Sequence, residues 1–115
     1  MNTLIACCGN DKGIKHLELL IEKQDWNNII VVASELIKLD CKKEVEFVLI
    51  DTKNPLTELS LELRQKLRGK LTDFEVGVNL FSGTGKEHMA LMSALIQSGI
   101  AIRFVAITPN GVKEI

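Results

Sequence analysis

Two short glycine-rich segments of this 115-residue chain contain most of its candidate functional side chains. They are Gly9-Asn10-Asp11-Lys12-Gly13 and Ser82-Gly83-Thr84-Gly85-Lys86. Glycine lets backbone N–H groups approach an anion closely, and the N-terminus of a following helix favours negative charge. The hydroxyl groups of Ser82 and Thr84 add donors, and Lys86 adds a full positive charge. The two segments together therefore predict a phosphate-binding site.

Neither segment matches a common nucleotide-binding motif. A P-loop requires a glycine five residues before its Gly-Lys pair, where this chain has Leu80. It also requires a serine or threonine after the lysine, where this chain has Glu87. The first segment lacks the G-x-G-x-x-G spacing of dinucleotide-binding proteins. The prediction thus depends on whether the fold brings the two loops together.

Five continuous apolar runs are typical of strands that are buried on both faces of a sheet. They cover residues 3–8, 29–33, 45–50, 74–81 and 100–107. The turn signal Pro109-Asn110-Gly111 predicts a hairpin that returns as a short antiparallel strand over residues 112–115.

Helices are predicted between these strands. Asn10 or Asp11 can cap the first helix, and Ser34 can cap a short second helix over residues 34–39. Asn54 and Pro55 are predicted as the N-cap and first residue of the third helix, and the fourth covers residues 86–97. The third helix has leucines at the spacing of one buried face: Leu56, Leu59, Leu63 and Leu67.

This alternation predicts an α/β fold, a Rossmann-like three-layer sandwich with a parallel sheet of order 3-2-1-4-5 and a short C-terminal antiparallel edge hairpin. Residues 1–115 are expected to form a single domain. In that order strands 1 and 4 are neighbours, so the two glycine-rich loops face each other at the carboxyl ends of the strands. The alternative flavodoxin-like order, 2-1-3-4-5, would separate the loops.

Charge and composition restrict the partners of this chain. A formal net charge of −1 excludes broad electrostatic attraction to long nucleic acid or to an anionic membrane. No apolar run reaches the ~18 residues of a membrane span, and the N-terminus lacks the features of a signal peptide. A cytoplasmic protein with no membrane partner is therefore expected.

The cysteines and histidines predict no metal site and no cofactor. Cys7, Cys8 and Cys41 form an odd set that fits a reducing compartment, and no Cys/His spacing resembles a zinc site. His16 falls within the first helix, where a structural role is expected. His88 falls in the first turn of the fourth helix, where a surface position or a bond at the helix start is expected.

The segment covering residues 78–91 resembles the signature of CARF domains, the CRISPR-associated Rossmann-like ligand sensors. Their fourth strand typically ends in an Asn-x-Thr-Gly-Gly-Thr-Lys-x-Met-like stretch that continues into a helix. Asn79, Ser82, Gly83, Lys86 and Met89 stand at corresponding places here. The loop differs from the family pattern, because Ser-Gly-Thr-Gly-Lys replaces Thr-Gly-Gly-Thr-Lys. About a third of the chain carries the match.

The resemblance implies a homodimer in antiviral defence that binds cyclic oligoadenylate, a small RNA ring, across its two-fold axis. The ligand-binding residues that it implies lie in the two loops: Gly9, Asn10, Asp11, Ser82, Gly83 and Lys86. Thr84 and Gly85 join them as candidate ligand-binding residues of the phosphate site predicted from the loop itself. It leaves open whether the chain is a stand-alone sensor, a slow, metal-independent ring nuclease that degrades its ligand, or a sensor domain excised from a longer protein. For cleavage, Lys86 and Ser82 are the candidate catalytic side chains, with Lys86 stabilising charge on the phosphate.

Two other functions fit the sequence. The fold could serve as a non-catalytic interaction module, because this architecture hosts many functions. Strand 1 also runs into Cys7-Cys8-Gly9-Asn10, which looks like the phosphocysteine loop of sugar phosphotransferase carrier domains. A helix N-terminus would stabilise the phosphothiolate of such a carrier, but that function leaves the second loop unexplained.

Overall fold

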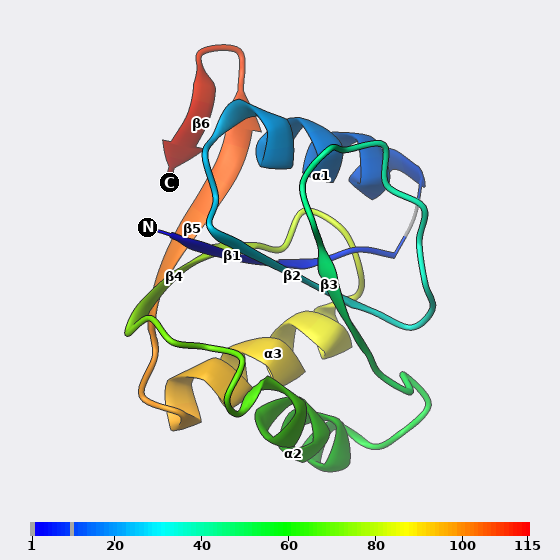
Figure 1. Ribbon diagram of the computed structural model, residues 1–115. Helices are drawn as coiled ribbons and strands as arrows, with labels where there is room; N and C mark the ends of the chain where they lie inside the picture. The colour runs from blue at the N-terminus through cyan, green and yellow to red at the C-terminus, as the bar shows by residue number, and fades with distance from the viewer. Residues whose placement is uncertain (1, 10) are drawn as a thin grey trace.

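A computed structural model describes residues 2–9 and 11–115 of the chain. These residues form a six-stranded sheet with α1 on one face and with α2 and α3 on the other (Figure 1). The strands are β1 (Thr3–Cys7), β2 (Asn28–Ala33), β3 (Glu46–Leu49), β4 (Glu75–Asn79), β5 (Ala101–Thr108) and β6 (Gly111–Glu114). The helices are α1 (Asp11–Lys23), α2 (Leu56–Leu67) and α3 (Gly85–Gln97).

The order of the sheet is β3-β2-β1-β4-β5-β6. All neighbouring pairs are parallel except β5 and β6, which are antiparallel. Ile5 of β1 pairs with Ile30 of β2 on one side and with Val78 of β4 on the other. The predicted α/β fold and its strand order are thereby confirmed, including the antiparallel edge hairpin, and the flavodoxin-like alternative is wrong.

Alternate residues of the central strands supply two separate hydrophobic cores. Ile5 and Cys7 of β1 point toward α2 and α3, whereas Leu4 and Ala6 point toward α1. All five residues of β1 are buried. A strand covered on both faces needs apolar residues at every position, which explains why the sequence shows runs rather than alternation. No helix in the described residues is long and apolar enough to cross a membrane.

The helix predicted over residues 34–39 is wrong. Residues 34–45 connect β2 to β3 without a helix, and Ile37 and Leu39 of this connection pack against the core on the α1 side. A helix advances only ~1.5 Å per residue, against roughly 3.3 Å for extended chain. The connection is short for a parallel crossover. An extended chain of this length spans the distance from the end of β2 to the start of β3, whereas the same residues in a helix would not.

The second correction concerns the start of α2. Asn54 was predicted as the N-cap, but Pro55 holds that position and α2 begins at Leu56, with no hydrogen bond from a capping side chain. The leucine spacing is confirmed, because Leu59 and Leu63 are fully buried and Leu67 nearly so. Leu56 packs at the edge of the same core.

Gly77 in β4 allows Trp26 to pack closely against the sheet. Trp26 is 4% exposed, and its indole N–H donates to the carbonyl of Leu20 at 3.0 Å. A Cβ on Gly77 would lie 3.1 Å from Cη2 of Trp26 and 3.4 Å from Cγ2 of Val105. The edge of the α1-side core therefore has no room for a side chain at this position.

Gly77→Ala should lower the free energy of unfolding by about 1–3 kcal/mol, because the added methyl group overpacks the indole. Urea denaturation measures the change. Gly85→Ala is the matched control, since a Cβ there meets no atom within 4 Å. Equal stability of Gly77→Ala and the parent protein would contradict the packing argument.

Candidate functional site

The two glycine-rich loops meet at the carboxyl ends of β1 and β4. The backbone N–H of Gly9 donates to Oγ of Ser82 at 2.8 Å. A Cβ on Gly9 would lie 3.4 Å from Cα of Gly83, so the two backbones are in contact. The contact follows from the pairing of β1 with β4, and it confirms that the loops face each other. Open α/β sheets bind their ligands at this kind of topological switch point.

Ser82 joins the two loops from a buried position. Ser82 is only 3% exposed, and its hydroxyl oxygen accepts the Gly9 N–H. Its carbonyl oxygen lies 2.7 Å from Nε2 of His88, and because a carbonyl can only accept, His88 Nε2 carries the proton. The expected bond of His88 near the helix start is present. A direct catalytic contact of Ser82 with a ligand stays a prediction, and it requires the loops to separate.

The hydroxyl group of Thr84 caps the start of α3. Thr84 is the N-cap, and its Oγ1 accepts the backbone N–H of Glu87 at 3.3 Å and donates to Glu87 Oε1 at 3.2 Å. Glu87 is 9% exposed, so a carboxylate lies inside the predicted phosphate site. Sequence reasoning missed this residue, although the Thr-x-x-Glu spacing of a capping box could have found it.

Glu87 also limits what can occupy the second loop. Gly83 has a positive φ of 99°, and a Cβ there would lie 2.9 Å from Oε2 of Glu87. The backbone conformation favours glycine at this position, and a Cβ would in addition displace the carboxylate of Glu87. The inner side of the loop is filled by the protein's own carboxylate, so a phosphate would have to approach from the outer side.

Cys7 is a core residue. Burial, with smaller contributions from the charges of Glu87 and Cys8, raises the pKa of the Cys7 thiol to about 12. Cys7 and Cys8 are each 1% exposed. A phosphocysteine carrier needs an accessible thiolate, so this environment disfavours that alternative.

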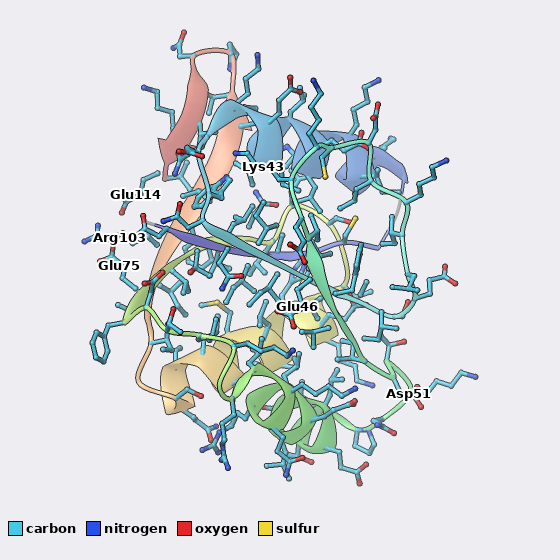
Figure 2. The ribbon with its side chains drawn as sticks, in the orientation of Figure 1. Lys43, Glu46, Asp51, Glu75, Arg103 and Glu114 are labelled. Atoms are coloured by element: carbon cyan, nitrogen blue, oxygen red, sulfur yellow. The ribbon has the colours of Figure 1, made fainter. Side chains whose placement is uncertain are left out.

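Lys86 extends away from the contact between Gly9 and Ser82. Its ammonium group is exposed and donates to the carbonyl of Thr52, at 2.9 Å, in the loop between β3 and α2. The backbone N–H of Lys53 in that loop donates to Asp51 Oδ1 at 3.0 Å, and Asp51 stands at the carboxyl edge of the sheet (Figure 2). The loop after β3 is thus a third part of this edge, which the sequence analysis did not include.

Three predicted site residues remain: Gly85, Asp11 and Asn10. Gly85 is the first residue of α3, with nothing within 4 Å of where a Cβ would stand. Asp11 begins α1 through its backbone, and its side chain lies outside the described positions, as does the whole of Asn10.

A second polar cluster lies on the α1 side of the same edge. Asn79, at the end of β4, is 4% exposed and donates from Nδ2 to the carbonyl of Val105 at 2.8 Å. Its Oδ1 accepts the backbone N–H of Phe81 at 3.2 Å. Nδ2 also lies 3.1 Å from Nε2 of His16. The ring of His16 stacks on that of Phe81, with centroids 3.9 Å apart and planes 3° from parallel.

These bonds determine the protonation of His16. The acceptor at Val105 and the donor at Phe81 fix the orientation of the Asn79 amide, so His16 Nε2 faces an N–H group and must accept from it. His16 is therefore neutral, with its proton on Nδ1. Burial lowers its pKa below the ordinary value, in agreement with this geometry. The structural role expected for His16 is confirmed.

Among residues 2–9 and 11–115, two ion pairs share one arginine at the end of the sheet opposite the glycine-rich loops. Arg103 contacts Glu75 and Glu114, each at 2.9 Å, and joins the starts of β4 and β5 to β6 (Figure 2). All three side chains are about half exposed. Such pairs contribute little stability individually, and these are remote from the carboxyl ends of the strands.

Comparison with protein-family models and with curated proteins finds no match for this chain. Its fold and loop geometry define it as a Rossmann-like α/β protein with two glycine-rich loops in contact at the switch point of the sheet.

Acidification should destabilise the protein through His16. The unfolded chain takes up this proton near pH 6.5, whereas the folded protein resists it until lower pH. The unfolded state then binds more protons, so the free energy of unfolding falls as the pH drops below about 6.5. Urea denaturation at pH 7.5 and 5.5 measures the effect.

His16→Gln is the matched variant, because a glutamine oxygen can accept from Asn79 and does not titrate. It should reduce the loss of stability between the two pH values. The same loss in both proteins would show that His16 is not the group responsible.

Proposed function

We propose that this chain is a homodimeric sensor that binds cyclic oligoadenylate at the carboxyl ends of β1 and β4. The observation that carries the proposal is the contact of the two glycine-rich loops, with the Gly9 N–H donating to Ser82 at the switch point. A ring with repeated phosphates requires a wide and symmetric surface, and two copies of this edge related by a two-fold axis supply one.

The resemblance of residues 78–91 to the CARF signature supports the proposal through its structural setting. Asn79 ends β4, Ser82 and Gly83 lie in the loop, and Lys86 and Met89 fall in α3. A strand, a glycine-rich loop and a helix N-terminus in this order are the context in which backbone donors bind phosphate.

Lys86 is suited to contact a phosphate even though it bonds to Thr52. The bond joins an exposed ammonium group to a backbone carbonyl, and water can replace such a bond at little cost. Rotation of a flexible lysine side chain toward the outer side of the Gly83 loop would then exchange a neutral acceptor for a charged one. Bonds to charged acceptors are the stronger kind.

We expect ring cleavage to be slow. The chain has two histidines, and the structure engages the Nε2 atom of both. Nε2 of His88 donates to Ser82, and Nε2 of His16 accepts from Asn79. Neither Nε2 atom is available to accept a proton from a ribose 2′-hydroxyl without breaking an internal bond, which leaves Nδ1 of His88 as the histidine nitrogen that carries a lone pair. Binding is therefore the main function that we propose.

We place the dimer contact on α3 and the adjoining strand β5. Met89 and Ile96 of α3 are 62% and 63% exposed, and Phe104 of β5 is 36% exposed. The N-terminal end of α3 carries the Ser82–Lys86 loop, so contact along this helix would bring two copies of the loop near one axis. Burial of these apolar side chains would stabilise the dimer.

Lys86→Ala should weaken binding of cyclic tetra-adenylate by roughly two to four orders of magnitude, because a two-fold site loses the charge-assisted bond twice. Isothermal titration calorimetry measures the affinity, with cyclic hexa-adenylate and linear tetra-adenylate as comparison ligands. Chromatography of the ligand afterwards reports cleavage.

Lys23→Ala is the matched control, since Lys23 is an exposed lysine in the last turn of α1. It should bind like the parent protein. If neither ring binds the parent protein, or if Lys86→Ala binds as well as Lys23→Ala, the proposal is wrong and an interaction module becomes the better account.

The dimer is tested separately by Ile96→Glu, which should shift the protein to the monomeric mass in light scattering at micromolar concentration. A charge in an apolar contact must lose its hydration without gaining a partner. Leu36→Glu is the control, because Leu36 is 71% exposed in the connection between β2 and β3. A monomeric parent protein, with or without cyclic tetra-adenylate, would contradict the proposed dimer.

A further inference from the structure

Phe81 presents one face of its ring to solvent at the carboxyl edge of the sheet. His16 covers the other face, with centroids 3.9 Å apart. The residue nevertheless remains 61% exposed. A ring that is covered on one side at van der Waals distance can be this exposed only if its opposite face is largely open.

This ring is held in place from several directions. Its backbone N–H donates to Oδ1 of Asn79, and Asn79 is itself buried and bonded to Val105. His16 is held by its own contact with Asn79. An exposed phenylalanine alone is ordinary, but this one is fixed by a buried amide and a stacked ring. A preorganised surface loses little conformational entropy when a second flat group stacks on it.

The position of the ring suits a nucleotide. Phe81 directly precedes Ser82, whose hydroxyl contacts the first loop. Lys12 is exposed and lies four residues before His16 on α1, and therefore on the same side of the helix. The Ser82 loop follows the ring in sequence and α1 stacks on it through His16, so a base on the open face would have its phosphate near this loop and near the side of α1 that carries Lys12.

We propose that the open face of Phe81 is a stacking platform for a purine base. This inference rests on the proposed function, since it assigns the base contact of the same ligand edge. Every base has a flat π-face, and stacking on an aromatic side chain contributes to binding without reading the sequence. The neutral His16 beneath the ring extends the platform to two stacked rings.

The test compares AMP with ribose 5-phosphate, which carry the same phosphate and differ in the base. Titration of AMP should shift the ring proton resonances of Phe81 in NMR spectra and move the adenine protons upfield, and ribose 5-phosphate should do neither. In Phe81→Trp, AMP should also quench the fluorescence of the exposed indole.

Phe81→Ala should weaken the binding of AMP by roughly 5- to 150-fold. The same loss is expected for cyclic tetra-adenylate if the parent protein binds that ligand. Phe74→Ala is the matched control, because Phe74 is 86% exposed and lies just before the start of β4, at the other end of the strand. Both variants should keep the melting temperature of the parent protein within a few degrees.

Four results would overturn the platform: equal binding of AMP and ribose 5-phosphate, no change of the Phe81 resonances, unchanged affinity of Phe81→Ala, or an equal loss in Phe74→Ala. A change of molecular mass in Phe81→Ala with unchanged AMP affinity would show that the ring contacts protein instead. Stacking of AMP without binding of either cyclic ring would refute the proposed function and leave the platform standing. If Phe81→Ala and the parent protein bind a cyclic oligoadenylate with equal affinity, the platform is refuted and the proposed function stands.

Discussion

The parallel pairing of β1 with β4 is the constraint on which the carboxyl edge of this protein depends. Leu4, Ile5 and Ala6 pair with Gly77, Val78 and Asn79, so both strands end at the same level of the sheet. The chain leaves them in opposite directions, to α1 on one face and to α3 on the other. The loops therefore leave a common point, and the bond from Gly9 to Ser82 forms where they cross.

Two buried polar residues convert this crossing into a defined shape. Asn79 uses both ends of its amide to connect β4, β5, α1 and the following loop. Glu87 closes the start of α3 and fills the inner side of the Gly83 loop. Buried polar groups must find partners or lose stability, so each of these side chains restricts the positions of all the groups that it contacts. The carboxyl ends of the strands therefore carry the open face of Phe81 on the α1 side and the exposed side chain of Lys86 on the α3 side.

Much of the fold could be predicted because the central strands are buried on both faces. Continuous apolar runs such as residues 3–8 permit few arrangements, and right-handed crossovers reduce them further. The prediction failed at residues 34–39, where short local periodicity suggested a helix. There the limited length of the connection between β2 and β3 outweighed local preference.

The glycine-rich loops after β1 and β4 could be predicted from the sequence alone, because glycine, serine and lysine follow within a few residues of long apolar runs. What those residues contact depends on the tertiary structure. Ser82 bonds to Gly9, Lys86 reaches Thr52, and His16 meets Phe81 across segments far apart in the chain. Local spacing carries no record of such contacts, since they depend on which strands become neighbours and on the direction in which each helix leaves the sheet. The N-cap contact of Thr84 with Glu87 is the exception, because its two partners are three residues apart.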